Sequence, residues 1–548
     1  MNRIQIPATG KAVVLALCLP LLSCTPKEAA QENPRVTLHD KIQRRPIQVK
    51  GCDNTETYLL DTLFRDVYHQ GIIKLYALRS HAPWARLEEQ GMPGVVWEGA
   101  EPVDPDYQNA PEKAVEQYRD LKFGVRIIFG LFQHFSKDGY SGQHSWESWY
   151  VNKSDGQYTM GEQECVDFLK RYYTTWQDFN PVNFDGNEWG ELFKEAGFKF
   201  AVLTAKNHDG FSIFHTQTKI PVLIRISDGE NPQYTTAVKH FSIEDSPYKK
   251  DLLKEYAEGL RKNGIAVGFY FSNPDWMDYD ARFGSGNIFR DPAYTRESDL
   301  EGYLRFANRH RQQLVELCSN YGKIDILSFD HGLPHSLWPE FKVTLKEIRR
   351  LQPDVMMRRR GIGNYGDFFT PEGSMPADSK YTRPWCVIGV SGNTAPAQDI
   401  INRLLYCVSL NGSFQWNCSP DKTGKFSPET VEKMKDVGAW LKINGEAIYS
   451  TRGWVRAKED NIYFTSSKDG AIVNAILTEW PGNGETITIK TFAEKDNAGL
   501  VVLNVSLLGY DNAIKWNHDE EGLKVTFPEK QPCNYAYALK IYMSTTAE

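Results

Sequence analysis

The sequence predicts an α/β chain in which a (β/α)8-like TIM barrel precedes a C-terminal antiparallel β-sandwich. Between residues 113 and 450, short continuous apolar runs alternate with amphipathic stretches, a pattern typical of buried parallel strands joined by helices. Over residues 451–548, short runs of alternating apolar and polar residues are separated by Gly, Asn and Asp, which favours a sandwich. The length of 548 residues is sufficient for a large barrel with additional domains.

Six apolar runs are the predicted barrel strands, and three amphipathic stretches are predicted helices. The strands are Phe123–Gly130, Phe200–Thr204, Ile265–Phe271, Ile324–Phe329, Val355–Met357 and Gly412–Trp416. The helices are 186–197, 299–321 and Pro428–Asn444, and Ser427 suits the start of the last one. Over ~330 residues this repetition fits a barrel better than an open sheet, although periodicity alone allows both.

Six further runs are predicted strands of the sandwich. They are Asn461–Ser466, Ala471–Thr478, Thr486–Ile489, Leu500–Val505, Leu523–Phe527 and Tyr535–Tyr542. Each run alternates apolar and polar residues, and turn-forming residues separate the runs. They predict a separate antiparallel domain rather than a continuation of the barrel.

The first 24 residues are predicted to be an export signal. Arg3 and Lys11 precede the apolar stretch Ala12 to Leu22, which is too short for a stable transmembrane helix. It ends in Leu21-Leu22-Ser23-Cys24, which resembles the lipobox of bacterial lipoproteins, whose Cys carries the lipid. We therefore expect an exported bacterial lipoprotein, in the periplasm or at the cell surface, that meets a membrane only through a lipid anchor at Cys24. Cleavage and secretion without a lipid is the alternative.

Composition restricts the classes of partner and cofactor. Residues 25–34 are a Pro/Glu/Gln-rich tether, and residues 35–112 are an N-terminal extension of unclear fold. Lys and Arg number 63 against 70 Asp and Glu, a net charge of −7, which argues against a nucleic-acid partner because phosphate binding needs a basic face. The spacing of Cys and His indicates no metal or redox centre, so we expect no cofactor.

Two carboxylates follow consecutive predicted strands, where such barrels place their working residues. Asp330 follows the run Ile324–Phe329, and alternation places it on one face with Ile326 and Ser328. Glu372 follows the next strand. Two acids from successive loops suit glycoside hydrolysis, in which one attacks or activates water and the other protonates the leaving oxygen. From spacing alone, a turn or capping role for Asp330 is equally compatible.

A set of motifs in the barrel region carries a family resemblance. The run Phe200–Phe211 combines a strand with a loop that ends Asn207-His208-Asp209-Gly210-Phe211. Further motifs follow the same order: Phe179-Asn180-Pro181, Phe184-Asp185, Glu188-Trp189, Phe269-Tyr270-Phe271-Ser272, Pro274-Asp275-Trp276, Ser409-Leu410-Asn411-Gly412, Asn417-Cys418-Ser419-Pro420 and Trp440 to Tyr449. Over about residues 113 to 454, the chain resembles the α-L-fucosidases of glycoside hydrolase family 29, whose loop usually reads His-His-Asp-Gly-Phe.

The resemblance implies a retaining exo-glycoside hydrolase that removes a terminal α-L-fucose or similar sugar from an oligosaccharide or polysaccharide. Asp330 matches the nucleophile of the family, and Glu372 matches the acid/base of a Thr-x-Glu stretch. The physical requirements agree, because a nucleophile must stay ionised whereas an acid needs a raised pKa. Asp367 and Asp275 are the alternative acids.

The expected sugar-binding positions match the family only in part. His208, Trp149, Tyr270 and Arg360 match, whereas Asn207 replaces the first His of the pair. In addition, an aromatic ring of the first strand is replaced by Arg126, and a Trp two residues before the nucleophile is replaced by Ser328. We expect all seven residues to bind substrate.

Arg126 has two interpretations. In the first interpretation, Arg126 forms a structural salt bridge with a core acid, because a buried Arg is normally paired. In the second, Arg126 faces the pocket and binds an anionic or hydroxylated substituent. In the family, the replaced rings help to hold the methyl group of fucose. Their replacement by Arg126 and Ser328 predicts a more polar glycone, such as α-L-galactose or a sulfated sugar. The alternative function is a catalytically impaired, fucosidase-like glycan-binding lipoprotein.

Overall fold

The computed structural model describes residues 103–136, 162–229, 232–284, 293–371, 383–391, 395–493 and 500–545, together with residues 287, 289 and 291. The chain divides into two compact units, Met1–Arg45 and Pro46–Glu548, and all described residues belong to the second. The predicted signal segment with Cys24, the tether, and residues 35–102 of the predicted N-terminal extension lie outside the described residues.

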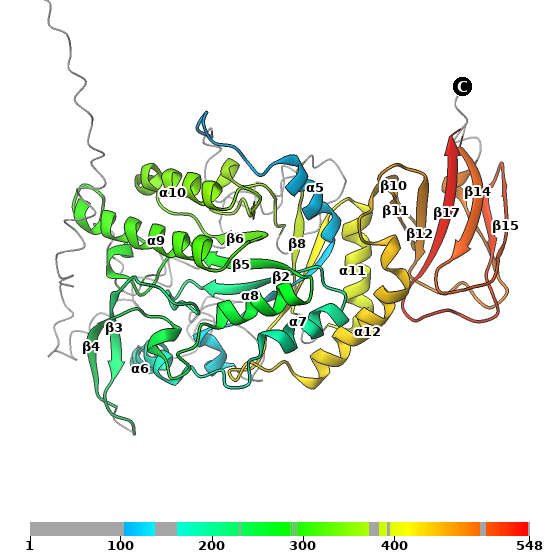
Figure 1. Ribbon diagram of the computed structural model, residues 1–548. Coiled ribbons are helices and arrows are strands. Elements are labelled where there is room, and N and C mark those ends of the chain that lie inside the picture. Colours follow the sequence, from blue (N-terminus) through cyan, green and yellow to red (C-terminus); the bar gives the residue numbers. More distant parts are fainter. Residues whose placement is uncertain are drawn as a thin grey trace, which may run out of the picture. The chain divides into compact units, whose positions relative to one another are not determined.

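A parallel sheet of seven strands forms the predicted TIM-like barrel (Figure 1). The strands are β1 (Phe123–Ile127), β2 (Phe200–Lys206), β5 (Ala266–Ser272), β6 (Ile326–Asp330), β7 (Met356–Met357), β8 (Cys386–Ser391) and β9 (Ser413–Cys418). Their order is β7-β6-β5-β2-β1-β9-β8. Isolated parallel bridges from Arg358 to Phe368 and from Phe369 to Trp385 connect the end of β7 to the start of β8. The six predicted strands are therefore confirmed, and β8 is the strand that the apolar pattern missed.

Helices connect the strands, and α7 to α10 follow the outside of the sheet in Figure 1. The helices are α5 (Glu112–Leu121), α6 (Glu162–Thr174), α7 (Gly186–Glu195), α8 (Leu252–Lys262), α9 (Leu300–Asn320), α10 (Trp338–Leu351), α11 (Ala397–Ser409) and α12 (Pro428–Asn444). The predicted helices correspond to α7, α9 and α12, and the side chain of Ser427 caps α12 by accepting from the backbone N–H of Thr430. Short 3₁₀ turns occur at Leu131–Phe135, Thr175–Asp178, Ile243–Asp245, Tyr279–Ala281, His335–Leu337, Gly363–Tyr365, Gly445–Ala447 and Lys490–Phe492.

The two faces of the parallel strands have different environments. Outward-facing side chains, such as Leu327 and Phe329 of β6, join the large core between sheet and helices. Inward-facing side chains at one end of the barrel form a smaller apolar cluster that includes Tyr118, Phe200, Val202, Tyr270, Ile326, Met356, Phe368 and Cys386. Further along the same strands, the inward positions carry Arg126, Ser328 and Asp330, and all three side chains are buried. The carboxyl ends of the strands therefore hold the polar part of the interior.

One element of the barrel region was not predicted from the sequence. After β2, the chain forms an antiparallel hairpin of β3 (Ile220–Arg225) and β4 (Tyr234–Lys239) before it enters α8 (Figure 1). Trp176 donates a hydrogen bond from its indole N–H to the Leu223 carbonyl at 3.2 Å. This contact fixes β3 to the chain that follows α6.

Two antiparallel sheets form the C-terminal sandwich. One has the order β10-β11-β12-β17-β14 and the other β13-β16-β15. The strands are β10 (Arg452–Glu459), β11 (Ile462–Ser466), β12 (Ile472–Leu477), β13 (Thr486–Ile489), β14 (Leu500–Leu507), β15 (Lys515–Asp519), β16 (Gly522–Thr526) and β17 (Tyr537–Thr545). The sequence did not predict β10 and β15, whose residues are largely half-buried or exposed and therefore lack a clear apolar pattern.

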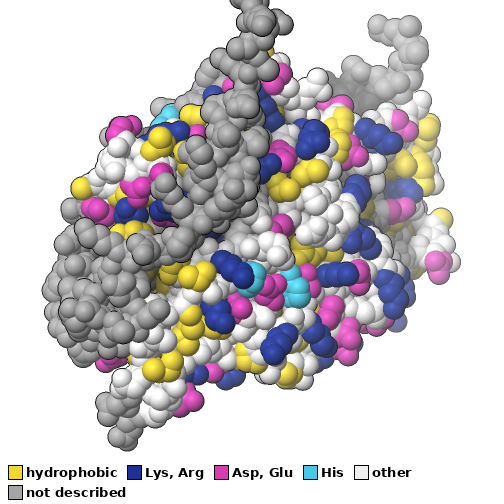
Figure 2. Space-filling view, turned by 60° about the vertical axis from the view of Figure 1, so that its left-hand side comes forward, with side chains coloured by type: hydrophobic (Ala, Val, Ile, Leu, Met, Phe, Trp, Pro, Cys, Tyr) yellow, Lys and Arg dark blue, Asp and Glu magenta, His cyan; other side chains and the backbone are white. Residues whose placement is uncertain are grey.

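The surface is of mixed charge. On the face drawn in Figure 2, basic and acidic side chains of the described residues are interspersed, in accord with the small net charge of −7. Among the described helices, none is both long and apolar enough to span a membrane.

Candidate active site

The site is built at the end of β6, where Asp330 enters the barrel interior. Ile326 and Ser328 point inward with Asp330, as the period of two predicted, and Tyr270 of β5 lies next to Ser328 in the strand register. Asp330 is only 6% exposed. A carboxylate with so little contact with water requires partners within the protein.

Three groups contact the Asp330 carboxylate. The Tyr270 hydroxyl donates to Oδ2 at 2.6 Å, and the Nε of Arg360 lies 2.9 Å from Oδ1. The backbone N–H of His331 donates to Oδ1 at 3.0 Å. Each of these groups stabilises the ionised form of the carboxylate.

The charges around Asp330 determine its ionisation. Burial by itself raises the pKa of the Asp330 carboxyl, but Arg360, His331, Arg358 and His208 together hold that pKa well below its ordinary value. Asp330 is therefore a carboxylate at neutral pH. A buried, ionised carboxylate at the carboxyl end of a barrel strand suits a nucleophile.

His208 and His331 lie beside this carboxylate. The centres of their rings are 4.5 Å apart with planes at 86°, and the ring of Trp276 lies 5.0 Å from that of His208. The Nδ1 of His208 forms a hydrogen bond with the Ser272 hydroxyl. The two imidazoles therefore lie beside the carboxylate, where polar groups of a bound sugar would meet them.

His208, Asp330 and His331 also have the spacing of a possible metal site, because one ligand atom from each lies within 4.8 Å of the others. The charge of the surroundings is unfavourable for a cation, since Arg360 contacts Oδ1 of Asp330 and Arg358 adds a further positive charge. These positive charges make the group a poor site for a metal ion.

Arg126 belongs to the same interior. Its guanidinium carbon lies 4.6 Å from the centre of the Tyr270 ring, whose hydroxyl contacts Asp330. The side chain is 5% exposed, and its Nε has no hydrogen-bond partner among the described residues. No described carboxylate lies within ion-pair distance of Arg126, so the described part of the chain does not contain the structural salt bridge that was the alternative interpretation.

The predicted residue Asn207 directly follows β2. Asn207 is buried, and its carbonyl accepts a hydrogen bond from the Gly210 N–H at 3.2 Å, which turns the chain after His208. Arg360 contacts Asp330 directly, as given above. Glu372 and Trp149 lie outside the described residues.

The two alternative acids have structural partners. Asp367 accepts from the Arg349 guanidinium at 2.7 Å and from the Met357 N–H at 2.8 Å. Asp275 accepts from the backbone N–H groups of Met277 and Asp278. Both carboxylates stabilise local backbone, and neither has a hydrogen bond or ion pair to Asp330 among the described contacts.

Two residues of the site were not among the predicted site residues. From the sequence, His331 could border the leaving-group site but a loop His is usually solvated, and Arg358 could be solvated or ion-paired, so neither was assigned a role. Arg358 is fully buried and donates from Nε to the Thr370 hydroxyl. The alternation Met356, Arg358, Arg360 after a predicted strand was the signal that places Arg358 inside the barrel.

Two family models match most of the chain. The sequence model described as alpha-L-fucosidase matches residues 98–446, and the one described as alpha-L-fucosidase C-terminal domain matches residues 457–542. The human plasma alpha-L-fucosidase is 24% identical over 479 residues, which cover 80% of this chain and 92% of the relative.

Two solved structures have the same fold. Alpha-L-fucosidase isoenzyme 1 from Paenibacillus thiaminolyticus superimposes with a TM-score of 0.61 at 23% identity, covering 79% of this chain and 99% of its own. A family 29 alpha-L-fucosidase from Bacteroides thetaiotaomicron, described as a trapped covalent intermediate in complex with 2-fluoro-fucosyl fluoride, superimposes with a TM-score of 0.62 at 21% identity, covering 81% and 99%.

Proposed function

Because this chain belongs to the alpha-L-fucosidase family of glycoside hydrolases, we propose that it is a retaining exo-glycosidase that removes a terminal α-L-fucose-like sugar with Asp330 as nucleophile. The observation that carries the proposal is the environment of Asp330, a buried carboxylate held ionised by Arg360 and hydrogen-bonded by Tyr270. The covalent intermediate trapped on the Bacteroides enzyme supports retention in a chain of the same fold.

The proposed reaction has two displacements. In the first, an oxygen of Asp330 forms a bond to the anomeric carbon, and the bond to the leaving oxygen breaks as Glu372 donates a proton to it. In the second, Glu372 accepts a proton from water, and the water oxygen displaces Asp330. Two inversions at the anomeric carbon give net retention, and both carboxyl groups return to their starting protonation states.

The assignment of Glu372 rests on its position in the sequence. It follows Thr370 and Pro371, and Thr370 is buried and accepts a hydrogen bond from Arg358 in the barrel interior. The last described residues before Glu372 therefore lie at the polar part of the barrel interior. Replacing Glu372 with Gln is expected to slow the hydrolysis of substrates with poor leaving groups far more than that of activated aryl glycosides, because activated leaving groups need no proton on the leaving oxygen.

Asp330→Asn tests the central claim. We expect turnover of an aryl α-L-glycoside to fall by about 10⁴-fold or more while ligand binding remains, because the amide cannot attack the anomeric carbon. Asp325→Asn is the control, since Asp325 is in the same strand region but bonds to the Val267 N–H and Lys323. A wild-type protein that binds glycan without any turnover would instead indicate the impaired, glycan-binding alternative.

Arg126 and Ser328 favour a glycone more polar than fucose. The guanidinium of Arg126 is buried beside Tyr270, which contacts Asp330, so a sugar in position for attack lies within reach of Arg126. An Arg whose Nε lacks a described partner gains most from a substrate hydroxyl or anionic oxygen, and an apolar methyl group would leave it desolvated without compensation. We therefore extend the proposal to α-L-galactosides or sulfated relatives.

Comparison of substrates tests this extension. The wild-type protein is expected to release nitrophenol from an α-L-galactoside faster than from the α-L-fucoside, and Arg126→Met is expected to reduce this preference about 10-fold or more. Arg225→Met, which removes an Arg from a surface pair with Asp178, is the control. An α-L-fucoside that reacts as fast as any α-L-galactoside would contradict the extension.

We also propose export and lipid anchoring at Cys24, on the basis of the sequence Leu21-Leu22-Ser23-Cys24. Metabolic labelling with a radioactive fatty acid should label the wild-type protein but not Cys24→Ser. Equal absence of label in both would indicate secretion without a lipid.

A further inference from the structure

Asn273, the residue after β5, binds the backbone carbonyl groups of the proposed nucleophile, Asp330, and of the next residue, His331. Its backbone N–H donates to the Asp330 carbonyl at 3.0 Å, and its side-chain Nδ2 donates to the His331 carbonyl at 2.7 Å. The side chain is fully buried. One residue therefore fixes two consecutive carbonyl groups at the end of β6.

The backbone that Asn273 holds is strained. His331 has a φ of +53°, in the left-handed region, which costs a residue with a Cβ about 1 kcal/mol or more. The φ angle of His331 determines the direction of its Cβ, and hence of the ring that lies beside the Asp330 carboxylate, while its N–H donates to Oδ1 of Asp330 at 3.0 Å. The strained conformation persists only while neighbouring groups hold the His331 carbonyl.

Gly361 makes room for this arrangement. A Cβ at residue 361 would lie 1.9 Å from the His331 carbonyl oxygen and 2.9 Å from Nδ2 of Asn273. Both contacts are far below van der Waals distance, so a side chain here would displace the hydrogen bond between Asn273 and His331. Arg360, the residue before this glycine, contacts the same carboxylate oxygen of Asp330.

The other end of the Asn273 amide contacts His310 of α9. The Nε2 of His310 lies 3.1 Å from Oδ1 of Asn273. Burial, with a smaller effect of the Lys206 charge, holds the pKa of His310 well below its ordinary value, so the imidazole is neutral. Because Nδ2 of Asn273 is the donor to His331, Oδ1 must accept, and the proton of His310 is therefore on Nε2.

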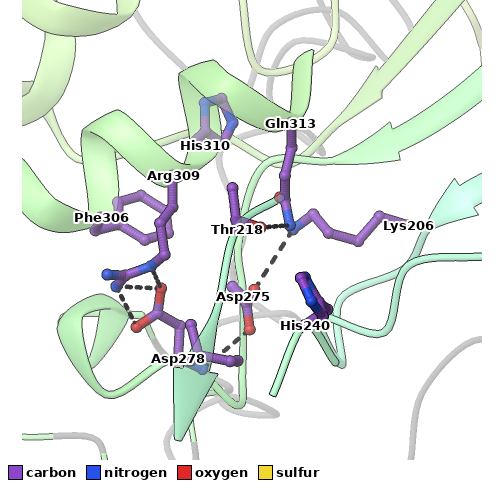
Figure 3. A pocket seen from close by; sticks show the side chains of 11 residues that line it. Lys206, Thr218, His240, Asp275, Asp278, Phe306, Arg309, His310 and Gln313 are labelled. Atoms are coloured by element: carbon purple, nitrogen blue, oxygen red, sulfur yellow. Dashed lines mark hydrogen bonds and ion pairs between the residues drawn. The ribbon is translucent and has the colours of Figure 1, made fainter. Parts of the chain in front are cut away.

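A buried network of charges holds the chain that follows Asn273 (Figure 3). Lys206 donates to the Pro274 carbonyl at 2.9 Å. Arg309 of α9 forms an ion pair with Asp278, and Arg305 of the same helix forms one with Asp280 at 2.9 Å. Lys206, Asp278 and Arg309 also line a small cavity of about 10 Å³, the volume that a single water requires, and their contacts leave the segment little freedom to move.

From this geometry we propose that Asn273 is a positioning residue, which fixes the Asp330–His331 peptide so that the Asp330 carboxylate and the His331 ring face the sugar. The inference rests on the proposed function, since it requires Asp330 to be the nucleophile. Without the Asn273 side chain, the His331 carbonyl loses its donor, so the His331 backbone relaxes from its left-handed conformation and its ring moves from its position beside Asp330.

Asn273→Ala is the first test, and Asn287→Ala is its matched control. Asn287 is equally buried and donates from its Nδ2 to two carbonyls, those of Asp275 and Asp278, but it has no contact with Asp330 or His331. We expect Asn273→Ala to lower kcat by about 10- to 100-fold with little change in KM, because misplacing a reacting group by about 1 Å has this effect. Asn287→Ala should leave kcat within about threefold despite a similar loss of thermal stability.

Asn273→Asp gives a readout that a purely structural role would not change. At neutral pH its carboxylate would repel the His331 carbonyl, whereas the protonated acid would again donate to it while still accepting from His310. The ratio of mutant to wild-type kcat should therefore rise as the pH falls. The other titratable or charged groups near residue 273 are His310, Asp330, His331 and Lys206, with Arg360 beyond Asp330, and they are common to both proteins, so the ratio reports residue 273.

The outcomes separate the two proposals. Equal kcat values for Asn273→Ala and Asn287→Ala, or a ratio for Asn273→Asp that is independent of pH, would overturn the role of Asn273. If Asp330→Asn retains activity in the same assay, the proposed nucleophile is wrong, whatever the Asn273 variants do.

Discussion

Tyr270 donates a hydrogen bond of 2.6 Å to Asp330 and at the same time presents its ring to Arg126, at 4.6 Å. The phenol therefore connects a residue expected to recognise the sugar with the carboxylate expected to attack it. Burial, and next the negative charge of Asp330, raise the pKa of Tyr270 well above its ordinary value, so the hydroxyl keeps its proton and remains a donor.

Removal of this donor should change the pH dependence of activity. In Tyr270→Phe the ring remains beside Arg126, but the ionised form of Asp330 loses a hydrogen bond worth about 1.5–3 kcal/mol, so its pKa should rise by about 1–2 units. The acidic limb of the kcat/KM profile should therefore move to higher pH. Tyr256→Phe is the control, because the Tyr256 hydroxyl bonds to the Gly268 carbonyl instead. An unchanged acidic limb in Tyr270→Phe would contradict this account.

Asp209 should make the stability of the fold depend on pH. Burial raises the pKa of Asp209 to about 6, although the Tyr172 hydroxyl and the Phe211 N–H donate to its carboxylate. The folded state therefore binds a proton more tightly than the unfolded state, and its stability decreases by up to about 3 kcal/mol as the pH rises from 4 to 7.

Asp209→Asn should remove this dependence. The difference in Tm between the variant and the wild-type protein should become more positive as the pH rises from 4 to 7, because the amide carries no charge to desolvate. Burial also raises the pKa of Asp278 to about 6. Because Asp278 titrates in both proteins, its effect on Tm cancels in the difference. A difference in Tm that is constant over this range would show that Asp209 does not titrate there.

A close contact between two helices should be sensitive to one added methyl group. A Cβ at Gly259 of α8 would lie 2.0 Å from the Gly186 carbonyl oxygen at the start of α7. Gly259→Ala is therefore expected to lower the free energy of unfolding by about 1–3 kcal/mol, without a change in the kcat of the folded fraction. Gly389→Ala is the control, since a Cβ there meets no atom within 4 Å. Equal Tm values for the two variants would contradict the expected overlap.

Activity should not require a divalent cation. The possible ligand atoms of His208, Asp330 and His331 lie close enough together to bind an ion, but Arg360 already lies 2.9 Å from the Asp330 carboxylate. Dialysis against EDTA should leave kcat unchanged, as measured on the same aryl glycoside. A loss of activity that a divalent cation restores would show that the histidines hold a metal.

Local patterns in the sequence were sufficient for much of the fold. The strand at Ile326–Asp330 was predicted from the largely apolar run Ile324–Phe329, and the period of two correctly placed Ser328 and Asp330 on the inward face. The helix Pro428–Asn444 was also located, because Ser427 is a strong N-cap and Pro suits the first turn. Such signals depend on residues only a few positions apart.

The environment of Asp330 depends instead on residues distant in the sequence. Tyr270 is 60 positions and Asn273 58 positions from the groups they contact at the end of β6, and the positive φ of His331 has no local signature. For the same reason, the sequence could not show that Asp367, an alternative acid, forms an ion pair with Arg349.

The sequence alone thus predicted the parallel strands and helices of the barrel region, the sandwich and the strand that carries Asp330, since local periodicity encodes which face of an element is buried. Only the tertiary structure decided which side chains surround that carboxylate and hold it ionised. The physical reason is that a pKa depends on charges and donors within a few ångströms in space, and the closure of the barrel, rather than the order of residues, brings them there.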